Sequence, residues 1–169
     1  DLANDLGNLA QRSLSIIAKG QGGRLPAPGD FSENDKTILA AADALIGKAR
    51  EAMKTQQLHQ VLNAAWAVVA DANRYFAGEA PWALAKTDPV RQGTVLYTTA
   101  EVIRQVAIVA QPFIPDAAGR LLDLIAVPAE QRDFSTLGGA GRLAPGGSLP
   151  PPAPVFPRYV EGEAKAETK

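Results

Sequence analysis

The chain has 169 residues, of which 46% are hydrophobic, and a formal net charge of −1. This size fits one globular domain with or without a tail, and the small net charge excludes a broad basic surface that would hold long stretches of nucleic acid. The sequence contains no cysteine, no apolar run near the ~20 residues of a membrane span and no signal-peptide pattern, so we expect a cytoplasmic protein with no disulfide and no membrane partner.

Hydrophobic residues at helical spacing predict a first helix over residues 1–19. The glycines of "KGQGG" end it, because glycine releases the backbone. The sequence opens at Asp1 directly within this helical pattern, without an initiator Met, and we therefore expect it to be a piece of a longer chain. Ser32, followed three residues later by Asp35, has the pattern of a capping box and predicts a second helix, whose apolar stripe continues to Met53.

A third helix is predicted over residues 58–76, with Trp66 in the core on its apolar stripe. Asp88 and Pro89 have the pattern of an N-cap and a first helical residue, and they predict the start of a fourth helix. The proline-containing segment "QPFIPD" separates that helix from a shorter fifth one. No alternating strand pattern occurs up to residue 127, so the predicted fold is all-α, an antiparallel bundle of about five helices.

The composition changes after Pro128, where the chain becomes rich in glycine and proline and ends in charged residues. Such a segment cannot build a core of its own. We therefore expect a helical domain over residues 1–128 and an irregular, extended Gly/Pro-rich tail over residues 129–169. Val155, Phe156 and Tyr159 indicate that part of the tail docks on a partner surface as extended chain. The tail is expected to add little to the core, so that truncation after Val127 lowers the melting temperature by less than about ten degrees.

Candidate catalytic and metal-binding side chains are scarce. His59 is the only histidine and lies among glutamines, which favours an exposed polar position over a catalytic or metal-binding one. Without a second histidine or a cysteine, a zinc-type ligand pair cannot form. No glycine-rich loop follows a predicted strand, so the phosphate-binding motifs of nucleotide enzymes are missing. We expect no catalytic residue, no metal site and no cofactor in this chain.

Two groups of residues are candidates for recognition. Asn8 and Arg12 lie four residues apart and therefore share one face of the first helix. Their amide and guanidinium groups suit the edges of nucleic-acid bases, and equally a carboxylate or a buried carbonyl. Trp82 follows Pro81 in the linker "GEAPWALAK", one helical turn before Lys86. Trp82 can either fill the core or present its ring to a flat ligand.

Four segments resemble, in the same order, the anticodon-binding domain of methionyl-tRNA synthetases: "LANDLGNLAQR", "NRYFAGEAPWALAK", "AIVAQPFIPDAAGRLLDLI" and "PAPVFPRYVEG". The resemblance implies a helical bundle, of the class I synthetase type, that reads the CAU anticodon of methionine tRNAs. It implies that Asn8 and Arg12 bond to anticodon bases, that Trp82 stacks on one of them, and that Pro81 holds the tryptophan. Lys86 is the candidate for a phosphate contact.

The resemblance also implies a parent enzyme, a methionine–tRNA ligase that attaches methionine to tRNA and uses ATP with magnesium. Its catalytic domain is expected before Asp1, because the His-Ile-Gly-His-type and Lys-Met-Ser-Lys-Ser-type signatures are absent from this sequence. The expected partners are methionine tRNA and the catalytic domain of the same chain. The extra C-terminal tRNA-binding and dimerisation module of some members is also missing here, so the resemblance gives no basis for dimerisation.

Three alternatives stay open at this point. The first is the anticodon-binding domain of another class I synthetase, such as the valine, leucine, isoleucine or cysteine enzyme, against which "APWALAK" argues. The second is a non-enzymatic interaction module in which Trp82 and the tail bind protein. The third is a purely structural bundle with Trp82 buried. A nearly buried Trp82 and an Asn8 that faces the core would argue against recognition.

Overall fold

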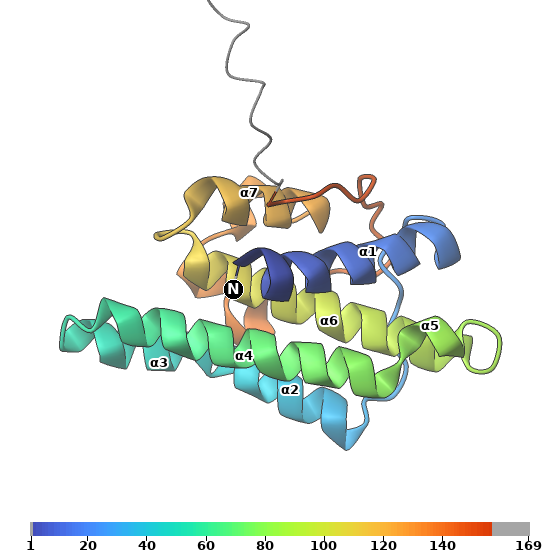
Figure 1. The fold of residues 1–169 in the computed structure, drawn as a ribbon, viewed down its shortest axis with the longest axis horizontal. Helices are drawn as coiled ribbons and strands as arrows, with labels where there is room; N and C mark the ends of the chain where they lie inside the picture. The colour runs from blue at the N-terminus through green and yellow to red at the C-terminus, as the bar shows by residue number, and fades with distance from the viewer. Residues whose placement is uncertain (1, 157–169) are drawn as a thin grey trace, which may run out of the picture.

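The computed structural model describes residues 2–156, and this part of the chain is helical with irregular connections (Figure 1). A π-helical stretch, Leu2–Gly7, leads into α1 (Asn8–Gly20), and the following helices are α2 (Glu33–Asp43), α3 (Leu45–Lys54), α4 (Leu58–Glu79), α5 (Pro81–Leu84), α6 (Pro89–Ala110) and α7 (Pro115–Leu124). Three short 3-10 turns follow, at Ala129–Gln131, Phe134–Thr136 and Gly138–Gly141. The predicted all-α class is confirmed.

The two helix starts predicted from local sequence are confirmed. The Ser32 hydroxyl accepts a hydrogen bond from the Asp35 backbone N–H at 3.3 Å, and the Asp35 carboxylate accepts one from the Ser32 N–H at 2.8 Å. This reciprocal pair is a capping box, which satisfies donors that a helix start leaves unpaired. The Asp88 side chain caps α6 by accepting from the Arg91 N–H. The predicted second helix is in fact two helices, α2 and α3, separated at Ala44.

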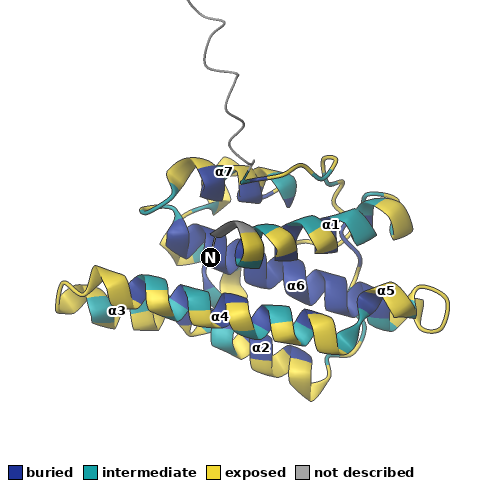
Figure 2. Ribbon diagram, in the orientation of Figure 1, coloured by how far each residue is buried: buried dark blue, intermediate teal, exposed yellow. Residues whose placement is uncertain are grey.

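Helix α6 is the centre of the molecule. Every residue from Gln92 to Ala110 is buried, and α6 contacts each of the other six α-helices (Figure 2). Its polar side chains are therefore cut off from water and need partners within the protein. The other helices cover α6 with apolar side chains. Trp66 of α4 is only partly buried and packs against the edge of the core. The prediction that Trp66 lies inside the core is therefore wrong.

Residues 129–156 are part of the fold, and the expectation that the tail adds little to the core is wrong. Leu137, Leu143 and Val155 are all buried in the same hydrophobic core as the helices. The backbone of Leu25 also pairs with this segment, donating to the Gly147 carbonyl at 2.9 Å and accepting from the Gly146 N–H at 2.7 Å. Phe156 packs against the core as a partly buried side chain, and Tyr159 lies outside the described residues.

The tail packs here because α6 carries a buried ion pair. Glu101 and Arg104 are 0% and 1% exposed and lie 2.7 Å apart. Buried charges are stable only when hydrogen bonds replace the lost water. The tail supplies these bonds: the Leu143 N–H donates to Glu101 at 3.0 Å, and Arg104 donates to the Thr136 carbonyl at 3.0 Å. Arg142 of the tail adds a second cation 3.1 Å from Glu101. An irregular segment thus completes the core through its backbone.

Candidate functional site

The turn between α4 and α6 holds Trp82 in a constrained place. Helix α4 ends at Glu79 and is capped by Ala80, whose φ of 45° lies in the left-handed region and separates α4 from α5. Pro81 follows as the first residue of α5, where its fixed φ suits a helix start and its missing N–H costs no hydrogen bond. Pro81 is buried, while Trp82 is 50% exposed. The turn therefore anchors one residue and presents the next at the surface.

Arg12 and Trp82, which lie 70 positions apart in the sequence, meet at this surface. The guanidinium carbon of Arg12 lies 5.2 Å from the centre of the Trp82 ring and 5.2 Å from the centre of the Phe76 ring. The two rings contact each other with their centres 5.9 Å apart and their planes tilted by 59°. This is a cation–π arrangement built from α1, α4 and α5.

Asn8 is exposed and begins α1, one helical turn before Arg12. It lies beside a small cavity of about 110 Å³ between α1 and the tail segment that contains Phe156. Neither condition that would argue against recognition holds, because Trp82 is not buried and Asn8 does not face the core.

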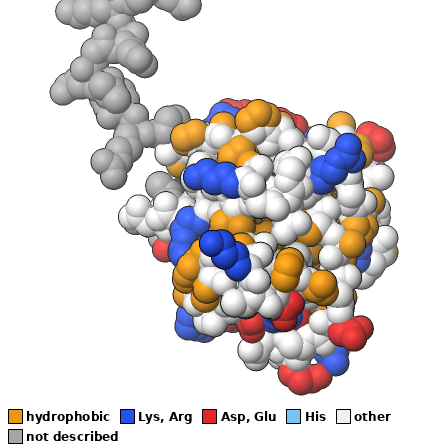
Figure 3. Space-filling model, turned by 90° about the vertical axis from the view of Figure 1, so that its right-hand side faces the viewer, with side chains coloured by type: hydrophobic (Ala, Val, Ile, Leu, Met, Phe, Trp, Pro, Cys, Tyr) orange, Lys and Arg blue, Asp and Glu red, His pale blue; other side chains and the backbone are white. Residues whose placement is uncertain are grey.

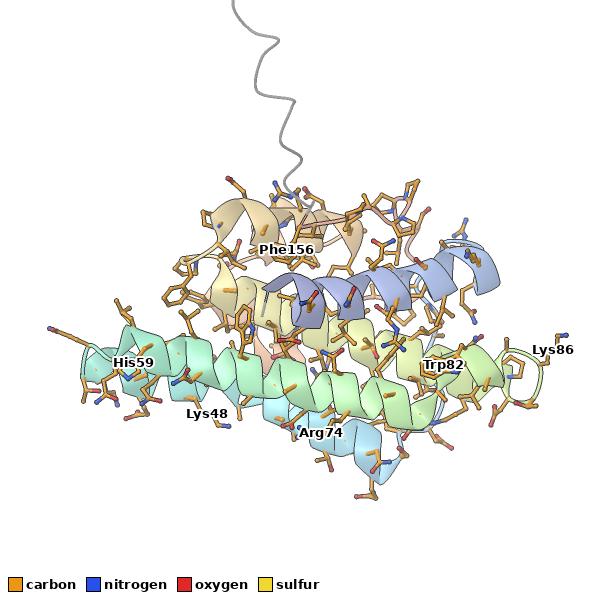
Figure 4. The ribbon with its side chains drawn as sticks, viewed as in Figure 1. Lys48, His59, Arg74, Trp82, Lys86 and Phe156 are labelled. Carbon is orange, nitrogen blue, oxygen red and sulfur yellow. The ribbon has the colours of Figure 1, made fainter. Side chains whose placement is uncertain are left out.

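Lys86 is exposed in the turn after α5, and Figure 4 shows it with Trp82 at one end of the bundle. His59 lies at the opposite end, exposed as predicted. The structure therefore brings Arg12 and the exposed Trp82 together at one surface, with Pro81 buried beside the tryptophan. Asn8 lies one turn before Arg12 on α1 and beside the tail segment, and Lys86 lies at the tip of the bundle.

A network of charged residues cross-links the helices on both sides of α5. Asp35 of α2 has a completely buried side chain and accepts hydrogen bonds from Arg91 of α6, at 2.9 Å for the Nη2–Oδ1 pair. Arg91 also lies 2.8 Å from Glu79, the last residue of α4. The Tyr75 hydroxyl donates to Asp35 as well. Because Glu79 precedes α5 and Arg91 follows it, this network fixes both ends of the turn that carries Trp82.

The hydrogen bonds of this network set the pKa of Asp35. Burial raises the pKa of the carboxyl, but the hydrogen bonds from Arg91, Tyr75 and the Ser32 N–H outweigh burial, and the pKa of Asp35 lies below its ordinary value of 3.8. In moderately acidic solution the unfolded chain then binds a proton that the folded chain does not. The contribution of Asp35 to stability is complete above the ordinary pKa and is lost as the pH falls through the lower pKa of the folded state.

We expect the free energy of unfolding to fall on acidification below about pH 4, and Asp35→Asn to weaken this dependence. Urea unfolding followed by circular dichroism at a series of acidic pH values measures the slope for both proteins. Glu33→Gln is the matched control, because the Glu33 side chain is 88% exposed and pairs only at the surface with Lys36. Equal slopes for Asp35→Asn and Glu33→Gln would contradict the expectation.

The end of the molecule that carries α5 has no continuous basic surface in the view of Figure 3, where single Lys and Arg side chains stand among hydrophobic and uncharged groups. This distribution fits the net charge of −1. A ligand at this end would be held by a few specific contacts rather than by a broad electrostatic field.

Residues 2–156 also lack two features. No group of three or more His, Cys, Asp or Glu side chains there could hold a metal ion. No helix in the same range is long and apolar enough to cross a membrane.

The fold and this surface together define a class: an all-α bundle with an arginine and a half-exposed tryptophan in contact at its surface. The family is given by the comparison with known domains. The family model for the anticodon binding domain of methionyl tRNA ligase matches residues 25–168. The chain belongs to this family of anticodon-binding domains.

Relatives and solved structures agree with this assignment. The chain is 63% identical over 163 residues to the methionine–tRNA ligase of Brucella suis biovar 1, covering 96% of this chain and 32% of that protein. It superimposes with a TM-score of 0.90 and 47% identity on apo Mycobacterium tuberculosis methionyl-tRNA synthetase, covering 95% of this chain and 33% of that one. The same enzyme bound by methionyl-adenylate gives a TM-score of 0.89 at 46% identity, covering 93% of this chain and 32% of that one.

The chain thus spans about a third of the length of the proteins it matches. The predicted family is confirmed. The family match argues against two of the alternatives, the domain of another class I synthetase and a non-enzymatic interaction module.

Sequence reasoning missed two features of this surface. Phe76 is the last residue of the predicted third helix, and the apolar spacing of that helix does not indicate that the Phe76 ring contacts Arg12 and Trp82. Gln92 was not singled out, although a glutamine in the first turns of a largely apolar helix is a signal that a buried polar partner exists.

Proposed function

We propose that this chain binds the CAU anticodon of methionine tRNAs as part of a methionine–tRNA ligase. The observation that carries the proposal is the contact between Arg12 and the half-exposed Trp82 at the surface of a domain of this family. Sequence-specific recognition of RNA acts mainly on unstacked loop bases, which stack on aromatic side chains and form hydrogen bonds through their edges.

Each residue has a distinct part in this proposal. The exposed indole of Trp82 offers a plane on which one anticodon base stacks. The guanidinium of Arg12 lies over that ring, 5.2 Å from its centre, so the donors for a base edge are held close to the tryptophan on which a base stacks. Asn8, one turn away on α1, offers a donor and an acceptor for a neighbouring base edge. Lys86 at the tip contacts a phosphate, and Pro81 holds the turn.

We propose that the catalytic activity of the whole enzyme resides in the part of the relatives that this chain does not span. We propose that the catalytic domain of the parent protein, with ATP and magnesium, attaches methionine to the tRNA that this domain holds, and that it does so in the cytoplasm. The Mycobacterium tuberculosis enzyme binds methionyl-adenylate, and this supports ATP as the source of the activated amino acid. Among the described residues of this chain, no group of three or more His, Cys, Asp or Glu side chains could hold the magnesium ion. We therefore place magnesium in the catalytic domain of the parent protein.

Arg12→Ala is expected to weaken binding of a methionine anticodon stem-loop by about 1–3 kcal/mol, the range of a contact to a base edge, with little change in stability. The measurement is a titration of the labelled stem-loop, repeated with a loop in which one anticodon base is changed. Arg74→Ala is the matched control, because Arg74 on α4 is 76% exposed and pairs with Asp71 away from Trp82.

Two outcomes would count against this proposal. If the chain binds the cognate loop no better than the changed loop, anticodon recognition is wrong. If Arg12→Ala lowers stability strongly but leaves RNA binding as in the wild type, Arg12 is a structural residue.

A further inference from the structure

Gln92 is a buried amide on α6, 3% exposed, and both of its polar atoms are used. Its Nε2 donates to the carbonyl oxygen of Pro81 at 2.9 Å, and its Oε1 accepts from Nε2 of Gln21 at 3.1 Å. A carbonyl can only accept, so Gln92 must direct its NH2 group toward Pro81. This fixes its oxygen toward Gln21, and the two amides form a directed chain that ends at the turn of Trp82.

The turn needs such a tie because α5 is very short. It contains four residues, and an isolated helix of one turn is not stable in water. Its position therefore depends on contacts with the rest of the protein. Pro81 has no N–H, so its carbonyl is the only backbone group through which it can form a hydrogen bond. The Gln92–Pro81 bond holds the residue that directly precedes Trp82.

The other end of the amide chain is attached to the helix that carries Arg12. Gln21 is the C-cap residue of α1, and its side chain reaches α6. The chain of hydrogen bonds thus runs from α1 through α6 to α5. The elements it joins are those whose relative placement sets the distance between Arg12 and Trp82.

We propose that Gln92 is a positioning residue for RNA recognition: it holds the Pro81–Trp82 turn in register with α1 so that Trp82 and Arg12 meet the same loop. The inference rests on the proposed function, since it names the residue that arranges that site. Gln92 itself does not touch the RNA. Its removal leaves Trp82 and Arg12 present but no longer held in a fixed relation.

The test compares Gln92→Met with Gln105→Met, both made in a Trp66→Phe background in which Trp82 is the only tryptophan. Methionine keeps the length of the side chain and removes the amide. Gln105 is also a fully buried glutamine of α6, but it bonds to Asp43 and to the Gly138 N–H, away from α5. The readouts are the local rotation of Trp82 by time-resolved fluorescence anisotropy, its quenching by acrylamide, stem-loop affinity, and melting temperature.

Gln92→Met is expected to increase the local rotation and quenching of Trp82, and to weaken cognate stem-loop binding roughly threefold to tenfold, the effect of about one net hydrogen bond. Gln105→Met is expected to lower the melting temperature without changing the rotation of Trp82 or the affinity. If Gln92→Met does not fold, Gln21→Met replaces it, since Gln21 is only partly buried and its loss leaves the Pro81 bond without its support from α1.

Equal Trp82 rotation in Gln92→Met and Gln105→Met would overturn the inference, and so would a more mobile Trp82 with unchanged affinity for the cognate loop. A different result separates the inference from the proposed function. If the wild-type chain does not bind the loop while Gln92→Met still mobilises Trp82, the hydrogen-bond chain does position the turn and anticodon binding is what fails.

Discussion

Truncation after Val127 is expected to lower the free energy of unfolding by at least about 5 kcal/mol, a large fraction of the roughly 5–15 kcal/mol by which a typical domain is stable. The first reason is lost burial. Leu137, Leu143 and Val155 leave the core, and each buried aliphatic side chain contributes roughly 1.5–3 kcal/mol.

The second reason is the buried ion pair of α6. Without the tail, Glu101 loses the Leu143 N–H and Arg142, and Arg104 loses the Thr136 carbonyl. Removing the partners of a buried charge is strongly destabilising, because the charge keeps the cost of lost hydration and loses the interactions that offset it. The charges would draw water into the centre of the bundle, since α6 contacts every other α-helix of the described chain.

Urea unfolding followed by far-UV circular dichroism measures this effect. A second truncation, after Phe156, is the control, because it keeps the described tail segment and removes only the residues beyond it. If the chain that ends at Val127 unfolds cooperatively at nearly the urea concentration of the full chain, the packing of residues 129–156 contributes nothing to stability.

Trp82→Ala is expected to weaken cognate stem-loop binding by about 1–3 kcal/mol, roughly tenfold to hundredfold, while the domain stays folded. Alanine removes the plane on which the base stacks. It also removes the contacts with Phe76 and Arg12, but half of the Trp82 surface is already in water. The loss of stability should therefore be well below the roughly 3–5 kcal/mol that a fully buried tryptophan would cost. Trp82→Phe should keep part of the stacking.

A stem-loop titration that follows Trp82 fluorescence in the Trp66→Phe background checks this prediction. The cognate loop should quench Trp82, and a loop with one changed anticodon base should quench it less at equal concentration. If the cognate loop causes no quenching and binds Trp82→Ala as tightly as the wild type, Trp82 does not stack on the anticodon.

The helices could be predicted because their signals are local. The reciprocal bonds of Ser32 and Asp35 need only a spacing of three residues, and Asp88 followed by Pro89 needs only adjacency. The packing of the tail could not be predicted in this way. The tail packs on α6 because Glu101 and Arg104 are buried there and bond to backbone groups of Leu143 and Thr136, more than thirty positions later. Neither composition nor periodicity indicates contacts over such a distance in the sequence.

In the candidate site, too, local sequence indicates some residues and leaves others unpredicted. Trp82 could be singled out because it is a tryptophan in a linker, and Arg12 because it shares a helix face with Asn8, and the family resemblance implied a role for each. The role of Gln92 depends on a single carbonyl eleven residues away and an amide on another helix, 71 residues away. Such a relation becomes visible only when the three elements are placed in space.

The bond between Glu101 and the Leu143 N–H has a consequence for synthesis on the ribosome. The two residues are 42 positions apart, so at roughly 5–20 residues per second Glu101 is made some 2–8 seconds before its backbone donor exists. Helix α6 is the central element of the bundle, yet its charged residues have their full set of partners only after the tail has been translated. The nascent bundle must therefore keep this face of α6 hydrated, and its core can close only when almost all of the described chain has left the exit tunnel.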